Sequence, residues 1–96
     1  MSFIFHPAAE QELHEAATYY DDKSPGLGRE FILELFRAVD FVCENPEAAP
    51  RVSDGKRRKI VARFPYGIIY SIRAEGIRIL AVMNLKRRPR YWQGRK

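Results

Sequence analysis

The sequence contains a single cysteine, Cys43, and only two histidines among its 96 residues. One cysteine excludes an internal disulfide and a cysteine-based zinc site. Cys43 falls among apolar residues of a helical pattern, which predicts a buried free thiol and fits a reducing compartment. His6 and His14 have no carboxylate or cysteine at metal-ligand spacing. We therefore expect structural or surface histidines and no metal site.

Long apolar runs and glycine-rich loops are also missing. The first residues lack the basic segment and long apolar stretch of a signal peptide, and no apolar stretch approaches the length of a membrane span. Gly26 and Gly28 have no preceding strand and no lysine where a phosphate-binding loop needs them, and there is no nucleophile elbow. These absences predict a soluble, cytoplasmic protein of one domain (residues 1–96) with no membrane association and no cofactor.

The first half of the chain has few basic residues, and the second half has few acidic ones. Residues 1–50 carry ten acidic and three basic residues, a net charge of −7, whereas residues 51–96 carry fourteen basic and two acidic residues, a net charge of +12. A small domain that concentrates positive charge in one region favours an anionic partner. Nucleic acid and an acidic protein segment both satisfy that requirement.

The first half predicts a short strand and two helices. Phe3–Phe5 is the candidate strand, and Pro7 suits the first position of a helix. Ser24 and Pro25 are typical of the N-cap and first position of a second helix, which Asn45-Pro46 ends. Apolar residues recur at helical spacing in both segments: Ala9, Leu13, Ala16, Ala17 and Tyr20 in the first, and Leu27, Phe31, Ile32, Leu35, Phe36, Val39, Val42 and Cys43 in the second. The short connection predicts an antiparallel helical hairpin.

The second half changes to a period of two, which is typical of strands. A proline-rich loop over 45–56 precedes predicted strands over 58–63, 67–73 and 77–84, with a bend at Phe64-Pro65 and a hairpin turn over 74–76. Helices followed by strands predict an α+β fold in which the helical hairpin packs on one face of an antiparallel sheet. A basic, aromatic tail follows from about residue 85.

The helices can cover only one face of this sheet. Strict alternation assigns to the other face a mixture of apolar and basic residues: Ile69, Ser71 and Arg73 from one strand, and Arg78, Leu80, Val82 and Asn84 from its neighbour. This face is either a partly solvated surface or a docking surface. Adjacent exposed Ile69, Leu80 and Val82 favour docking of an amphipathic acidic peptide.

Two dense basic runs, 56–59 and 86–90, extend this positive region, and Tyr91 and Trp92 follow the second run. Guanidinium groups bind phosphates, and aromatic rings stack on unpaired bases. Either run can equally be a solvated surface. The chemistry that such residues allow without a metal is RNA cleavage, in which cations stabilise the transition state and a tyrosine or lysine moves protons. The candidates are Arg58, Lys59, Arg63, Arg78, Arg87, Arg88 and Tyr91.

Several segments together resemble the RelE/ParE superfamily of type II toxins. They are 64–72 (Phe-Pro-Tyr-Gly-Ile-Ile-Tyr-Ser-Ile), 77–84 (Ile-Arg-Ile-Leu-Ala-Val-Met-Asn), and the ending with Arg87, Arg88, Pro89, Tyr91, Trp92 and Arg95. The helical hairpin is also similar, through Ala9, Leu13, Ala16, Tyr19, Tyr20, Phe31 and Asn45-Pro46. The resemblance covers nearly the whole chain. It implies a β-α-α-β-β-β fold and a toxin held inactive, as a hetero-oligomer, by a cognate antitoxin.

The superfamily divides by mechanism. RelE-like members cut messenger RNA on the ribosome, using two lysines two apart on one strand, an arginine that opens the next, and later an arginine and a tyrosine. In this chain Arg58 matches the first lysine and Arg87 the later arginine, but Ile60 and Gly67 occupy the second lysine and first arginine positions. Tyr91 lies nearer to Arg87 than the family pattern has it. ParE-like members instead inhibit DNA gyrase, although many have histidine where Asn84 stands.

These departures favour a ParE-like toxin with a protein target such as DNA gyrase. A RelE-like, ribosome-dependent endoribonuclease and a non-toxic RNA-binding module stay open as alternatives. A nuclease would use Arg58, Arg63, Arg87 and Tyr91. The residues predicted to bind the antitoxin or target are Ile69, Arg73, Arg78, Leu80, Val82, Asn84, Arg88 and Trp92.

Overall fold

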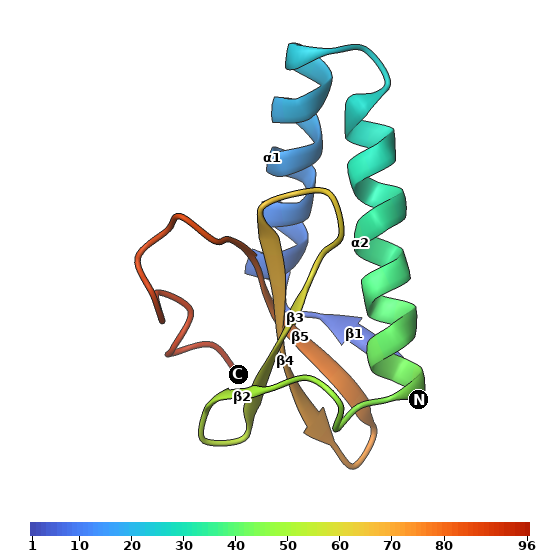
Figure 1. The fold of residues 1–96 in the computed structure, drawn as a ribbon. Helices are drawn as coiled ribbons and strands as arrows, with labels where there is room; N and C mark the ends of the chain where they lie inside the picture. Colours follow the sequence, from blue (N-terminus) through green and yellow to red (C-terminus); the bar gives the residue numbers. More distant parts are fainter.

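The computed structural model describes residues 1–96, which form two helices on one face of a five-stranded sheet (Figure 1). The elements, in chain order, are β1 (Phe3–Phe5), α1 (Pro7–Lys23), α2 (Leu27–Glu44), β2 (Arg51–Ser53), β3 (Lys56–Ile60), β4 (Tyr66–Arg73) and β5 (Gly76–Asn84). The predicted α+β class and helical hairpin are confirmed.

The sheet has the order β1-β5-β4-β3-β2 and differs from the predicted one in two respects. β1 runs parallel to β5, so the sheet is mixed rather than wholly antiparallel. The α1–α2 hairpin leads from β1 at one edge of the sheet to β2 at the opposite edge, and the antiparallel strands β3, β4 and β5 then bring the chain back beside β1. Within the predicted loop, β2 forms an additional short strand that pairs with residues 56 and 57 of β3.

The two helices approach most closely near their connection. Gly26 adopts a left-handed conformation (φ 89°), so α2 begins at Leu27 and not at the predicted Pro25. The Asp21 carboxylate accepts a hydrogen bond of 2.8 Å from the Gly28 N–H, which caps α2 from the neighbouring helix. A side chain at Gly28 would collide with the carbonyl oxygen of Ala17, so the close contact of the helices requires glycine there.

His6 is a capping residue, in agreement with the structural role predicted for it. Its Nδ1 accepts a hydrogen bond of 3.0 Å from the Ala8 N–H, and Pro7 occupies the start of α1. Burial and the nearby Arg78 and Arg95 lower the pKa of His6. The neutral imidazole is therefore the form that caps the helix.

The main core lies between the helices and the sheet. Its centre is a group of aromatic rings in which Phe31 of α2 contacts Phe64 and Tyr66 at ring-centre distances of 5.3 and 4.9 Å. Tyr20 of α1 contacts the same three rings. Edge-on contacts of this kind stabilise aromatic pairs beyond the area that they bury. Cys43 is a half-buried free thiol that packs against this core, and burial raises its pKa.

A β-bulge in β5 changes which residues face the helices. Ile69 pairs with Ala81 but Tyr70 pairs with Ile79, so Leu80 is an extra residue without an opposite partner. Beyond the bulge the alternation is reversed, because one inserted residue exchanges the two faces. Val82 consequently packs in the main core, and the prediction that it lies on the second face is wrong.

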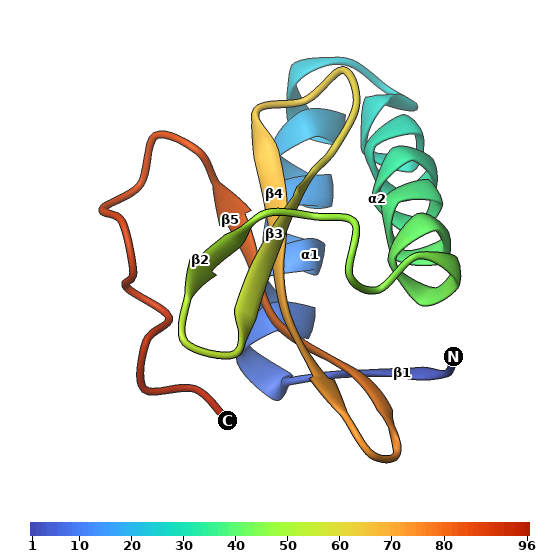
Figure 2. The same ribbon diagram turned by 60° about the horizontal axis from the view of Figure 1, so that its bottom comes forward.

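The second face of the sheet is covered by the end of the chain. Residues 85–96 cross the side of the sheet opposite to the helices (Figure 2). Trp92 is 1% exposed and forms a second core with Ile69, Leu80, Ala81 and Met83. The predicted exposure of Ile69 and Leu80 is therefore wrong, since the tail supplies the apolar cover that a partner was expected to supply.

Neither α1 nor α2 combines the length and the apolar character of a membrane span.

Candidate functional site

An ion pair anchors the tail at the β5 bulge. At the bulge, side chains form hydrogen bonds with two backbone groups of β5, the Leu80 carbonyl and the Val82 N–H. The Glu12 carboxylate of α1 accepts a hydrogen bond of 3.0 Å from the Val82 N–H. Arg95 donates to both oxygens of Glu12, at 2.9 and 3.0 Å, and to the Leu80 carbonyl at 3.0 Å. One partly buried pair thus joins α1, β5 and the tail, and the hydrogen bond with Glu12 raises the pKa of Arg95.

Tyr91 lies between two arginines of the tail. The Arg87 and Arg95 guanidinium carbons are 4.1 and 5.2 Å from its ring centre. The Tyr91 hydroxyl is buried near the Glu12 carboxylate, but the two groups do not have the geometry of a hydrogen bond. Burial, followed by the nearby carboxylate of Glu12, raises the pKa of Tyr91 well above its usual range. The phenol is therefore protonated at neutral pH and is unsuited to act as a general base.

Arg58 lies on the same side of the sheet as the tail. Its aliphatic chain passes over Gly67, where there is no side chain to obstruct it. Arg58 and Trp92 line a hollow of about 210 Å³. The other residues that line it are Val52, Ile69, Met83, Pro89 and Arg90. Glycine at position 67, which departs from the RelE-like pattern, thus provides the space that Arg58 occupies.

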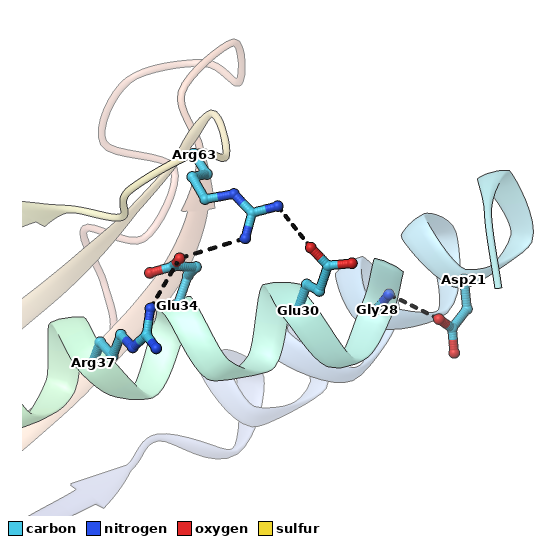
Figure 3. Close-up of polar contacts among 6 residues, drawn as sticks. All are labelled: Asp21, Gly28, Glu30, Glu34, Arg37 and Arg63. Carbon is cyan, nitrogen blue, oxygen red and sulfur yellow. Dashed lines mark hydrogen bonds and ion pairs between the residues drawn. The ribbon is translucent and has the colours of Figure 1, made fainter. Parts of the chain in front are cut away.

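Arg63 lies on the helix side of the molecule (Figure 3). It follows β3 in a left-handed conformation (φ 71°) that directs its guanidinium to α2. There it pairs with Glu30 at 2.6 Å and with Glu34 at 3.6 Å. Glu34, whose side chain is 8% exposed, also pairs with Arg37. These ion pairs therefore hold the loop between β3 and β4 against α2.

The four residues predicted for a nuclease have different environments. Arg87 and Tyr91 are in contact, Arg58 lies beside Trp92, and Arg63 is held by carboxylates of α2. An RNA-cleaving site needs several cations directed at one phosphate. Arg63 is directed instead at Glu30 and Glu34 of α2.

Two of the predicted binding residues, Arg73 and Arg78, lie at the β4–β5 hairpin end of the sheet. They line a hollow of about 190 Å³ with Ser2, Ile4 and Lys96. Arg78 donates to the Lys96 carbonyl at 3.1 Å, and so it also holds the end of the tail.

The remaining predicted binding residues have different environments. Asn84 ends β5, where its side chain accepts a hydrogen bond of 2.9 Å from the Lys86 N–H. Arg88 is exposed on the tail. Trp92 is buried in the second core, and its indole N–H has no partner. Binding by these residues stays a prediction, but Trp92 can contact a partner only if the tail moves.

Sequence reasoning missed a hollow of about 230 Å³ between α2 and β3. Arg37, Ala38 and Phe41 line it from α2, and Lys59, Ile60 and Ala62 line it from the sheet. The Lys59 ammonium lies 4.1 Å from the centre of the Phe41 ring. The available sequence signal for this hollow was Phe41, an apolar residue that is 38% exposed on α2. No group of three or more potential metal ligands is found.

Comparison with known proteins identifies the family. Residues 3–89 match the family model described as ParE toxin of type II toxin-antitoxin system, parDE. No curated protein matches the chain. A solved structure described as the chromosomal ParDE TA system from P. aeruginosa superposes with a TM-score of 0.79 and 19% sequence identity, covering 90% of this chain and 97% of that chain. Because the family model spans nearly the whole sequence, the chain belongs to the ParE toxin family of type II toxin–antitoxin systems.

Proposed function

We propose that this protein arrests growth by binding a cytoplasmic protein target such as DNA gyrase, and that a cognate antitoxin neutralises it by forming a hetero-oligomer. The toxin performs no hydrolysis in this account. It is a binding protein whose basic surface recognises acidic partners.

The dispersal of the candidate nuclease groups carries the proposal. Arg63 is neutralised by Glu30 and Glu34, and the Tyr91 phenol is buried and protonated. The cations of residues 86–90 follow β5, are exposed and belong to no ion pair. Such a cluster favours association with an acidic protein surface.

Controlled expression tests the proposal in two steps. Expression of the chain should arrest growth, and co-expression of the small protein encoded beside its gene should relieve the arrest. Purified chain should then inhibit gyrase supercoiling, and Arg58→Ala should retain both effects. Absence of arrest from a folded, soluble chain would overturn the toxin proposal.

A RelE-like endoribonuclease is the second candidate, because Arg87 and Tyr91 do lie in contact. That function predicts cleavage of ribosome-bound messenger RNA that Arg87→Ala abolishes. Mapping of transcript ends after induction separates it from the first proposal, which predicts intact transcripts.

A further inference from the structure

The outer edge of β3 is open at its C-terminal end. β2 pairs with β3 only at residues 56 and 57, and the last bond on that side is 3.0 Å long, from the Arg58 N–H to the Pro50 carbonyl. No strand lies beside Ile60. An open edge is a template on which another chain can add a strand.

The backbone of Ile60 is directed to this open edge. Peptide groups of an antiparallel strand point alternately to its two neighbours. The Val61 N–H binds the Tyr66 carbonyl at 2.9 Å, so residue 61 faces β4, whereas Arg58 faces Pro50. Ile60 lies two residues beyond Arg58 and its backbone is oriented in the same way. Its N–H and C=O therefore face outward, away from β4.

The hollow between α2 and β3 adjoins this edge. Ile60 and Ala62 form one side of it and Phe41 the other, and the Ile60 and Phe41 residues are 46% and 38% exposed. An apolar hollow next to an open edge is the combination that strand addition uses: the backbone supplies hydrogen bonds, and the hollow receives an alternate side chain.

The charge around the hollow selects the partner. Lys59 projects over Phe41 and belongs to none of the ion pairs of the chain. Arg37 has a 74% exposed side chain and shares the nearly buried Glu34 with Arg63 (Figure 3). Two copies joined symmetrically at this edge would bring like charges together, because an isologous interface repeats each residue. A segment with carboxylates fits instead.

We propose that the antitoxin adds an extended segment to β3 at Ile60–Ala62, with an apolar side chain in the α2–β3 hollow and a carboxylate at Lys59. This inference rests on the proposed function for the identity of the partner. It locates the contact on the helix-side edge of the sheet, away from the face that the tail covers.

The test uses Ile60→Pro, which removes the outward N–H and leaves the bonds to β4 intact. The probe is the purified protein encoded beside the gene, and its affinity is measured by calorimetry. Ile60→Pro should weaken binding about tenfold or more, because it removes a backbone hydrogen bond and obstructs the added strand. Ile60→Thr keeps the N–H and should change the affinity by about twofold at most.

Charge supplies a second pair of variants. Lys59→Glu should weaken binding, whereas Arg29→Glu, the same charge change on an exposed part of α2 outside the hollow, should not. Circular dichroism confirms that each variant is folded. Amide exchange of the wild-type complex should show new protection at Ile60.

The outcomes separate the two proposals. If the wild-type chain does not bind the neighbouring protein, the proposed function fails and this inference fails with it. If the wild type binds and folded Ile60→Pro binds equally well, the strand-addition site is wrong while the proposed function stands. If Ile60→Pro instead abolishes self-association of the isolated chain without affecting antitoxin binding, the edge receives a second copy and the assigned partner is wrong.

Discussion

At the scale of single residues, several polar groups contribute to packing rather than to chemistry. Tyr91 is the clearest case, since its ring lies between Arg87 and Arg95 while its hydroxyl has no hydrogen bond. A buried hydroxyl without a partner contributes nothing to stability and costs its desolvation. The stabilising contribution of this side chain therefore comes from its ring.

Tyr91→Phe should leave growth arrest intact and change the free energy of unfolding by less than about 0.5 kcal/mol, or increase it slightly. Growth curves and denaturant unfolding measure the two effects. Loss of arrest by a stable Tyr91→Phe protein would show that the hydroxyl acts in the mechanism.

His6 gives the chain a pH-dependent stability. Its folded-state pKa is lowered, so the unfolded state binds more protons near the ordinary histidine pKa of about 6.5. The contribution of His6 is complete above that pH and is lost as the pH falls from there through the lowered value.

His6→Asn retains a capping acceptor but cannot titrate in this range. Unfolding of both proteins at pH 7.5 and pH 5 should show a larger loss of stability at pH 5 for the wild type. Equal losses would mean that another group controls the pH dependence.

At the scale of elements, the tail packs on the sheet and completes the folded domain. It covers the second face through Trp92 and is tied to the bulge through Arg95 and Glu12. The side chains of Arg95 and Glu12 are 20% and 12% exposed, so some water reaches the pair. Breaking it leaves a largely buried carboxylate without its cation, which is strongly unfavourable.

Arg95→Ala should lower the free energy of unfolding by about 2–3 kcal/mol, somewhat less than for a fully buried pair. Because Trp92 is the only tryptophan, its fluorescence reports the tail directly, and the emission should shift to longer wavelength. Arg88→Ala removes an exposed charge from the same tail and should change neither quantity. If Arg95→Ala behaves like Arg88→Ala, the ion pair does not hold the tail.

Prediction from the sequence succeeded for the helices and β4 but failed for the end of β5. Helical periodicity and the alternation of β4 are local, and both predicted their elements well. The side chains that bind the backbone at the β5 bulge are distant in sequence: Glu12 lies 70 residues from Val82, and Arg95 lies 83 residues from Glu12. No local pattern contains that information, and so the predicted faces of residues 81–84 were exchanged: Ala81 and Met83 lie on the second face, whereas Val82 and Asn84 lie on the helix side.

At the scale of the whole molecule, the uneven charge of the sequence becomes two sides of a structure. The helices carry most of the acidic residues, and the sheet and tail carry most of the basic ones. Some of these charges pair across the layers, as Glu12 does with Arg95 and Glu30 with Arg63. Lys59 on β3 and the cations of residues 86–90 belong to no ion pair, and they are the groups through which we propose that partners bind.

The most direct test of this account is a supercoiling assay with purified gyrase and purified chain, run in parallel with a ribosome-dependent messenger RNA cleavage assay on the same preparation. The account predicts loss of supercoiling with intact messenger RNA, and recovery of supercoiling when the antitoxin is added. Cleaved messenger RNA with unaffected supercoiling would contradict it.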